Sequence, residues 1–170
     1  IEYLGKDNIK NVWVDETRPY LQGSRLTAFE LKKLEIPHQI VVEGAASFLM
    51  DKGLVDAIFV GADRIVENGD TANKIGTANL SILAKYFDIP FYVVAPKSSF
   101  DVSLPTGDSI EIEMRPESEI TMYKGHNISP ICSKAFNPSF DITRGENITG
   151  IICEEKYLAP PFKKSIKEIF

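Results

Sequence analysis

The fold is indicated most clearly by residues 57–64, Ala57-Ile58-Phe59-Val60-Gly61-Ala62-Asp63-Arg64. Four apolar residues break abruptly at Gly-Ala-Asp, which is typical of a buried strand that ends in a loop. The polar stretch over residues 61–77 carries carboxylates, a guanidinium, an amide and an ammonium in a short space. Because a packed core does not need that composition, we expect a ligand site at the end of this strand.

Similar short apolar runs recur along the chain with helical patterns between them. They are Val12-Trp13-Val14, Gln39-Ile40-Val41-Val42 and Phe91-Tyr92-Val93-Val94. Helices are predicted over residues 24–34, 45–52 and 71–87, with Leu26, Phe29 and Leu34 as the inward stripe of the first. Strands that alternate with helices at this spacing predict an α/β fold, with a Rossmann-like parallel sheet and helices on both of its faces.

The ends of these elements also carry signals. Asp70 suits the N-cap of the third helix, and Asp88-Ile89-Pro90 suits its end. Residues 110–113 alternate like a half-exposed strand, and a short helix is predicted over residues 163–170. Because no repeat or domain boundary is visible, residues 1–170 are interpreted as a single Rossmann-like domain.

The beginning of the sequence suggests part of a longer protein. The first residue is Ile, and residues 1–6 resemble the end of a helix that runs into a turn. We therefore expect this chain to be the carboxyl-terminal part of its protein, with the amino-terminal domain absent.

Composition and charge limit the classes of function. The 170 residues carry a formal charge of −5, and a pI near 5.1 leaves no basic field for nucleic acid. Cys132 and Cys153 lie far apart without zinc-site spacing, so neither a metal site nor a disulfide framework is indicated. No apolar run approaches the roughly 18 residues of a membrane span. A cytoplasmic protein is therefore expected.

Polar clusters follow all four predicted strands. They begin at Asp15, Glu43, Gly61 and Ala95. In a parallel sheet these loops share the carboxyl edge, where open α/β folds bind their ligands. We therefore expect the four loops to form one site.

The first loop offers groups for an anion. Arg18, Gln22 and Arg25 lie between a predicted strand and its helix, where free backbone N–H groups and two guanidiniums would suit a negative charge. The alternative is that the two arginines pair with surface carboxylates. We expect Gln22 to point toward a ligand and Arg18 to contact its anionic group.

Asp63 is the candidate catalytic residue, because a carboxyl group at a strand end can be partly buried and serve as a general acid or base. Asp70 competes for this role, but helix capping explains its position. Lys74 lies in the first turn of a predicted helix, where its positive charge is unfavourable beside the helix dipole. An anionic ligand would compensate that charge. Asn73 beside it can donate and accept hydrogen bonds. The alternative for Lys74 is a solvated lysine without a ligand.

Five segments, in order along nearly the whole chain, resemble the 5-methylthioribose-1-phosphate isomerase family. They are residues 15–27, 61–77, 90–96, 113–116 and 137–143. Relatives of that family include ribose-1,5-bisphosphate isomerases and regulatory subunits of translation initiation factor 2B. The Asp-Arg-Ile, Asn-Gly-Asp-Thr-Ala-Asn-Lys and Ala-Pro-Lys-Ser-Ser-Phe-Asp motifs favour the isomerase. The resemblance implies that Asp63 matches the family's proton donor and that Gln22, Asn73 and Lys74 match its substrate-binding positions.

The resemblance further implies a cofactor-free, homodimeric aldose–ketose isomerase of methionine salvage. Because the anomeric oxygen of its substrate carries phosphate, the sugar ring cannot open freely, and a proton donor near the ring oxygen is needed. Hydrogen then moves between C1 and C2 by a proton relay or by a hydride shift, and the sequence leaves both open.

The sequence also departs from that family. The family's Arg-Gly-Ala loop, a further arginine and a catalytic cysteine lie upstream of the segment that matches Asp15, and none of them is present in residues 1–14. Cys132 and Cys153 lie elsewhere and are interpreted as structural thiols. Glu43 and Arg144 stand where the family often has Asp and Pro. We therefore expect this chain to be inactive alone; a non-catalytic sugar-phosphate or nucleotide-binding subunit and a ribose-1,5-bisphosphate isomerase remain the alternatives.

Overall fold

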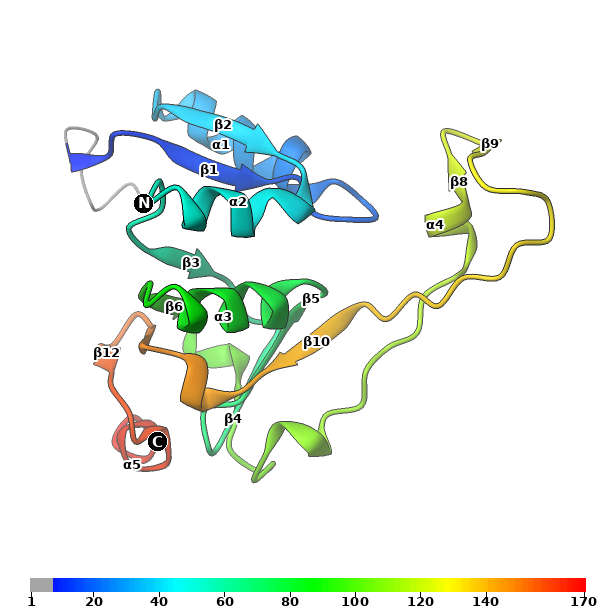
Figure 1. The fold of residues 1–170 in the computed structure, drawn as a ribbon. Helices are drawn as coiled ribbons and strands as arrows, with labels where there is room; N and C mark the ends of the chain where they lie inside the picture. The colour runs from blue at the N-terminus through cyan, green and yellow to red at the C-terminus, as the bar shows by residue number, and fades with distance from the viewer. Residues whose placement is uncertain (1–7) are drawn as a thin grey trace. The chain divides into compact units, whose positions relative to one another are not determined.

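The structure is a computed structural model that describes residues 8–170 (Figure 1). The chain divides into two compact units, Ile1–Phe48 and Leu49–Phe170, and the boundary falls within α2 (Ala46–Asp51). That residues 1–170 form a single domain stays a prediction. The predicted helix end at residues 1–6 lies outside the described residues.

The first unit is a strand, a helix and a parallel strand. Its elements are β1 (Val12–Asp15), a π-helical turn (Gly23–Thr27), α1 (Ala28–Lys33), β2 (His38–Val41) and a 3-10 turn (Glu43–Ala45). β1 and β2 pair in parallel, with Val12 opposite His38. Val14, Leu31 and Ile36 form the buried cluster of this unit. Both strand predictions are confirmed here.

The predicted helix over residues 24–34 is also confirmed, but its predicted inward face is wrong at two of three positions. Leu34 packs against the buried cluster, whereas Leu26 and Phe29 are 61% and 58% exposed and Ala28 and Leu31 are buried instead. The Ala28 N–H donates to the Gly23 carbonyl, five residues back, instead of the four of an α-helix. This wider turn rotates the side chains that follow it, so a 3.6-residue count identifies the wrong face.

The second unit contains a four-stranded sheet in the order β12-β11-β6-β3. Its strands are β3 (Ile58–Val60), β6 (Phe91–Val94), β11 (Gly150–Ile152) and β12 (Tyr157–Leu158). β3, β6 and β11 are parallel, and β12 is antiparallel at the edge. The α/β class with a parallel sheet is therefore confirmed, as are the strands predicted near residues 57–60 and 91–94.

Two helices pack on this sheet, α3 (Thr77–Tyr86) and α5 (Phe162–Lys167). The buried cluster draws on both helices and on the parallel strands: Ala84, Phe91, Val93, Ile151, Phe162 and Ile166. The helix predicted over residues 163–170 thus exists but ends earlier. No helix within residues 8–170 combines the length and the apolar character needed to cross a membrane.

A second sheet has the order β10-β5-β4-β7. Its strands are β4 (Arg64–Val66), β5 (Thr71–Lys74), β7 (Phe100–Asp101) and β10 (Phe140–Thr143). β4 and β5 form an antiparallel hairpin whose turn contains Asn68 and Gly69, with Gly69 at φ +87°. The prediction of a helix from residue 71 is therefore wrong, because α3 begins only at Thr77. Asn-Gly after a β-branched strand is a strong hairpin signal that outweighed the helix signal.

Residues 114–138, called the arm below, extend away from the two sheets of the second unit (Figure 1). The arm contains α4 (Ser118–Thr121), β8 (Met122–Tyr123) and β9 (His126–Asn127), the last two as an antiparallel hairpin. At its base, Met114 bridges to Pro138. The strand predicted over residues 110–113 is wrong: the backbone there forms no strand.

Candidate functional site

The loop after β3 places Asp63 directly before β4. The Asp63 N–H donates to the Ala72 carbonyl at 2.9 Å, while its side chain is exposed. The expected partial burial of this carboxyl group is therefore not seen within this chain. The neighbouring Arg64 guanidinium contacts the Asp101 carboxylate at 3.4 Å, so Arg64 is paired with β7.

Asn73 lies across the hairpin from Asp63, one position beyond the Arg64–Ala72 pair. Its Nδ2 donates to the Thr77 hydroxyl at 3.0 Å. Its Oδ1 faces the backbone of Gly61, where an added Cβ would lie 3.9 Å away. The structure thus brings Asp63 and Asn73 together at the carboxyl end of β3.

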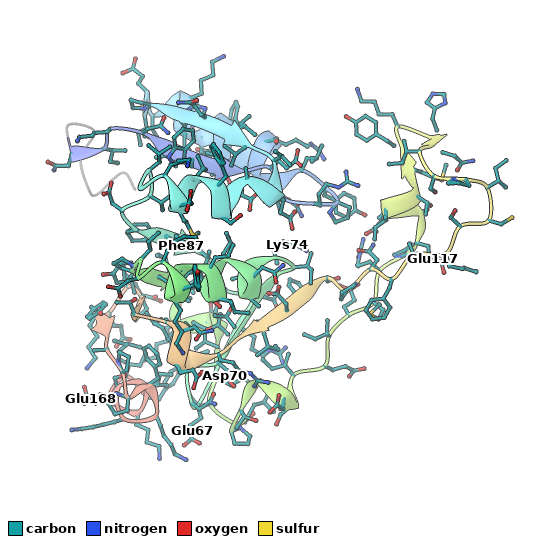
Figure 2. All side chains as sticks on the ribbon, viewed as in Figure 1. Glu67, Asp70, Lys74, Phe87, Glu117 and Glu168 are labelled. Atoms are coloured by element: carbon teal, nitrogen blue, oxygen red, sulfur yellow. The ribbon has the colours of Figure 1, made fainter. Side chains whose placement is uncertain are left out.

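Lys74 ends β5 and is half-buried (Figure 2). Its Nζ donates to the Ser139 carbonyl at 3.1 Å and lies 4.6 Å from the centroid of the Phe140 ring. Neither contact neutralises the charge, and no carboxylate within the described residues makes an ion pair with it. Its predicted place in a helix is wrong, but a partly buried ammonium without a counter-ion still suits an anionic ligand.

The N-terminus of α3 is already occupied by a carboxylate of this chain. The N–H groups of Gly76 and Ala78 donate to Asp141 at 2.8 and 3.0 Å. Asp141 comes from β10, where it lies opposite Asn73 in the strand register. The sequence pattern gave Asp141 no role of its own, since a cap supplied from more than 60 residues away leaves no local signal.

The loop after β6 meets the loop after β3, as expected for parallel neighbours. The Ser99 hydroxyl donates to the Ala62 carbonyl at 3.3 Å. Lys97, in the same loop, pairs with Glu155 at 2.9 Å. The carboxyl ends of these two strands therefore do share an edge, with Asp63 on it.

In the first unit, the turn after β1 was expected to hold an anion with free backbone N–H groups. The Arg18 N–H instead donates to the Glu43 carboxylate at 2.8 Å. The Ser24 N–H donates to the Glu16 carbonyl at 3.3 Å. These groups are not free, so this part of the expectation is wrong; an anion contact by the Arg18 guanidinium stays a prediction. The Arg25 guanidinium donates to the Tyr20 carbonyl at 3.3 Å.

Two side-chain oxygens near this turn are buried and have no hydrogen-bond partner within residues 8–170. They are Asp15 Oδ1 and Gln22 Oε1. Asp15 ends β1, and burial, followed by the charges of Glu43 and Glu16, raises its pKa to about 6. Gln22 was predicted from the sequence as a ligand contact, whereas Asp15 was named only as the start of the polar cluster after the first strand.

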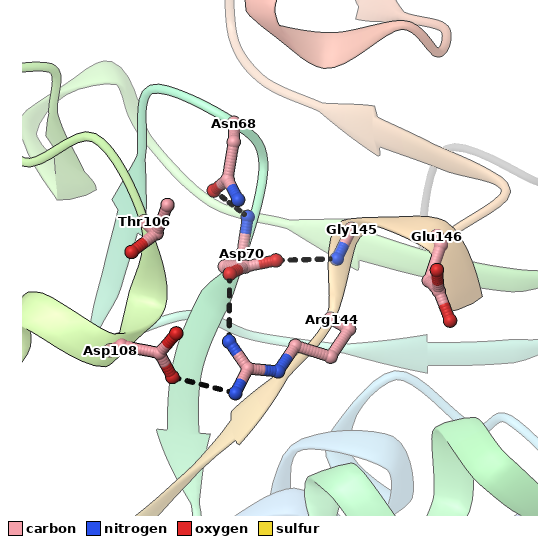
Figure 3. Close-up of a pocket in the computed structure, with 7 residues that line it drawn as sticks. All are labelled: Asn68, Asp70, Thr106, Asp108, Arg144, Gly145 and Glu146. Carbon is pink, nitrogen blue, oxygen red and sulfur yellow. Dashed lines mark hydrogen bonds and ion pairs between the residues drawn. The ribbon is translucent and has the colours of Figure 1, made fainter.

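Asp70 has a structural environment. The residue is 4% exposed, and its carboxylate accepts hydrogen bonds from Gly145 N–H at 2.8 Å and Arg144 Nη1 at 3.2 Å (Figure 3). It also accepts one from Gly107 N–H at 3.0 Å. Burial raises the pKa of Asp70, but these donors and the Asn68 side chain together hold it below its ordinary value. Asp70 is therefore not a helix N-cap as predicted.

A cavity of about 500 Å³ lies beside Asp70. It is lined by Asn68, Asp70, Thr106, Asp108, Arg144, Gly145 and Glu146. None of the predicted site residues lines it, and it lies at the turn of the β4–β5 hairpin, away from Asp63. Among residues 8–170, no group of three acidic, histidine or cysteine side chains could hold a metal ion.

The structure thus belongs to the class of α/β proteins in which polar side chains gather at the strand ends, here a carboxyl, an amide and an ammonium. The chain belongs to the initiation factor 2 subunit family, whose model matches residues 4–160.

Curated relatives point to one activity within that family. The chain is 53% identical over 159 residues to methylthioribose-1-phosphate isomerase of Caldicellulosiruptor saccharolyticus, covering 94% of this chain and 46% of the relative. It is 56% identical to the protein of that name from Sulfurihydrogenibium sp., covering 94% and 47%. The chain thus spans about half the length of the relatives it matches.

Solved structures agree in fold. A 5-methylthioribose 1-phosphate isomerase from Pyrococcus horikoshii OT3 matches with a TM-score of 0.93 and 46% identity, over 96% of this chain and 46% of the other. A structure titled translation initiation factor eIF-2B, subunit delta, from A. fulgidus matches with a TM-score of 0.90 and 41% identity, over 94% of this chain and 46% of the other.

Proposed function

We propose that the protein carrying this chain is an aldose–ketose isomerase of methionine salvage that converts 5-methylthioribose 1-phosphate into 5-methylthioribulose 1-phosphate. The observation that supports this most is the identity of about half the residues, over nearly the whole chain, with proteins named for that activity. The cluster of Asp63, Asn73 and Lys74 at the strand ends supports it independently.

Asp63 is proposed as the acid of the reaction. The substrate's phosphate blocks simple ring opening, so the ring oxygen must receive a proton, and a carboxyl group can deliver it. Hydrogen then moves from C2 to C1, by proton relay or hydride shift. The Asp63 carboxyl projects from the edge shared by the β3 and β6 loops, where it is open to a ligand.

The other predicted residues bind substrate in this proposal. Lys74 attracts the phosphate, because among residues 8–170 its charge has a carbonyl and an aromatic ring as partners and no carboxylate. Asn73 keeps its Oδ1 toward Gly61 for a hydroxyl group. In the first unit, Gln22 binds the sugar, and the Arg18 guanidinium contacts an anionic group.

We further propose that this chain supplies only part of the active site and is inactive alone. The family's catalytic cysteine has no counterpart in residues 1–170, and the curated relatives are about twice as long. The missing groups would come from an amino-terminal part of the same protein. Turnover of methylthioribose 1-phosphate by the isolated 170-residue chain would refute this.

The test of the activity is substitution of Asp63 in the longest protein that carries this chain. Asp63→Asn should lower the rate of ketose formation by about 10²–10⁴-fold and leave substrate binding nearly unchanged. Asp56→Asn is the matched control, because Asp56 is an exposed carboxylate before the same strand. Equal rates for wild-type protein and Asp63→Asn would contradict the role of Asp63.

A second candidate is a non-catalytic binding subunit, favoured by the fold match to the structure titled eIF-2B subunit delta. Such a protein would bind a sugar phosphate or nucleotide without converting it. A ribose-1,5-bisphosphate isomerase would instead turn over a substrate that has a second phosphate in place of the methylthio group. Measuring turnover of both substrates by the same preparation separates the three functions.

We also propose a cytoplasmic homodimer. The arm supports self-association, because Ile131 and Phe136 are 82% and 80% exposed, more than an apolar side chain normally is in water. Sedimentation equilibrium of the protein and of Phe136→Asp tests it: the wild type should sediment as a dimer and the variant as a weaker dimer or a monomer. A monomeric wild-type protein would refute the dimer.

A further inference from the structure

We propose that Asp15 is a further substrate-binding residue, which together with Gln22 accepts hydrogen bonds from hydroxyl groups of the sugar. This inference rests on the proposed sugar-phosphate substrate. It starts from Asp15 Oδ1 at the end of β1 and Gln22 Oε1 in the turn that follows, two buried oxygens without a hydrogen-bond partner among the described residues. Buried polar atoms in folded proteins nearly always have a partner, so these two oxygens point to a missing donor.

The two residues are held side by side by the backbone. The Glu16 carbonyl accepts the Ser24 N–H, and Gly23 packs so closely on Asp15 that an added Cβ would overlap the Asp15 carbonyl. Only glycine fits at that contact. The strand end that carries Asp15 and the turn that carries Gln22 are therefore fixed against each other before any ligand binds.

The chemistry of these two unpaired oxygens indicates which part of the ligand they bind. Both atoms are acceptors, so they need a donor, and a sugar hydroxyl is one. A phosphate dianion offers only acceptors and would be repelled. Glu16 and Glu43 add negative charge beside Asp15, and the Arg18 N–H is already taken by Glu43.

The turn also has a backbone typical of functional loops. Thr17 and Leu21 have φ values of +64° and +57°, which side chains rarely adopt. Gln22 follows directly on the second of them. The strained turn thus carries an unpaired acceptor, and a donor group of the ligand would supply the missing hydrogen bond.

The test measures binding and stability together in the longest protein that carries this chain. Asp15→Ala removes the acceptor, Asp15→Asn keeps one oxygen at the same size, and Glu16→Gln removes a neighbouring charge as the matched control. Isothermal titration uses two probes, 5-methylthioribose 1-phosphate and inorganic phosphate. Thermal melting of each unliganded protein reports on folding.

We expect Asp15→Ala to raise the Kd for methylthioribose 1-phosphate by about 10- to 100-fold, with a smaller rise for Asp15→Asn. The Kd for inorganic phosphate should stay within about threefold, and Glu16→Gln should change neither value by more than that. The melting temperature of Asp15→Asn should be unchanged. That of Asp15→Ala should be lower, because the Asp15 carboxylate also accepts the backbone N–H groups of Glu16 and Thr17. In turnover assays the loss should appear mainly in KM.

An unchanged Kd for the sugar phosphate, with normal wild-type turnover, would overturn the role of Asp15 and leave the isomerase standing. A lower melting temperature for both Asp15 variants would also overturn it, because the carboxylate would then serve the fold. Binding that depends on Asp15 in a wild-type protein without turnover would support the inference and refute the isomerase. A wild-type protein that does not bind the sugar phosphate would refute both.

Discussion

Asp70→Asn is the substitution for which the structure gives the clearest quantitative expectation. The Asp70 carboxylate joins three segments of the second unit, because it accepts the N–H groups of Gly107 and Gly145 and a guanidinium hydrogen of Arg144. Asparagine has the same shape but only one side-chain oxygen. Its amide nitrogen must therefore face a donor, and at least one of these three donors loses its acceptor.

The size of the effect follows from burial. Gly107 and Gly145 are buried, and a hydrogen bond to a charged acceptor contributes about 1.5–3 kcal/mol. The Arg144 side chain is 48% exposed, so water replaces much of that ion pair and little is lost there. We therefore expect a loss of about 2–4 kcal/mol, which lowers the melting temperature by roughly 5–15 °C in a chain of this size.

Urea unfolding followed by circular dichroism measures this loss, and amide hydrogen exchange at Gly107 and Gly145 locates it. Asp108→Asn is the matched control: Asp108 contacts the same arginine at 2.7 Å, but its side chain is 72% exposed. It should cost less than about 0.5 kcal/mol. The explanation fails if Asp70→Asn melts within 1 °C of the wild type, or if the control loses as much.

The same carboxylate predicts a pH dependence. Its donors hold the pKa of Asp70 below the value of an unfolded chain, so the native state favours the charged form. The stabilisation is present above the unfolded pKa, near 3.9, and is lost as the pH falls through the folded value. The difference in stability between wild type and Asp70→Asn should therefore be constant from pH 5 to 7 and shrink in stronger acid; a difference that grows in acid would contradict it.

Three further outcomes are expected. Gly69→Ala should lower the free energy of unfolding by about 2–4 kcal/mol, because φ is +87° and the added Cβ would overlap Phe162. Gly53 also has a positive φ, +63°, but open space around it, so Gly53→Ala should lower it by only about 1–2 kcal/mol. The same urea assay measures both. Asp141→Ala should destabilise by about 1–2 kcal/mol and speed hydrogen exchange in the first turn of α3, and unchanged exchange there would exclude a capping role. Lys74→Met should raise the Kd for methylthioribose 1-phosphate by about 10- to 100-fold with little change in melting temperature, and an unchanged Kd by calorimetry would remove Lys74 from the site.

The parallel strands were predictable from the sequence because a buried strand leaves a strong local signal. The runs at residues 57–60 and 91–94 are short, β-branched or aromatic, and bounded by Gly or Pro, and they form β3 and β6. The failure at residues 71–74 has a different origin. Asp-Thr-Ala-Asn-Lys suits a helix start locally, but pairing with β4 on one side and β10 on the other stabilises a strand there.

The strand-end position of Asp63 was predictable, because it follows from the order of elements along the chain. Lys74 was placed in a helix and lies at the end of β5 instead. Partners depend on distant segments: Lys74 contacts residue 139, and the cap of α3 comes from β10. A pattern within a short stretch of sequence cannot predict contacts between residues so far apart along the chain.

Unpaired polar groups therefore indicate the chemistry of a ligand more directly than sequence motifs do. A motif shows only that a residue type recurs, whereas a buried polar group without a partner shows which kind of group a ligand would have to supply. Lys74 keeps a positive charge without a carboxylate among the described residues, and Asp15 and Gln22 keep acceptors without donors. Lys74 of the second unit therefore needs an anion, whereas Asp15 and Gln22 of the first unit need hydrogen-bond donors such as hydroxyl groups.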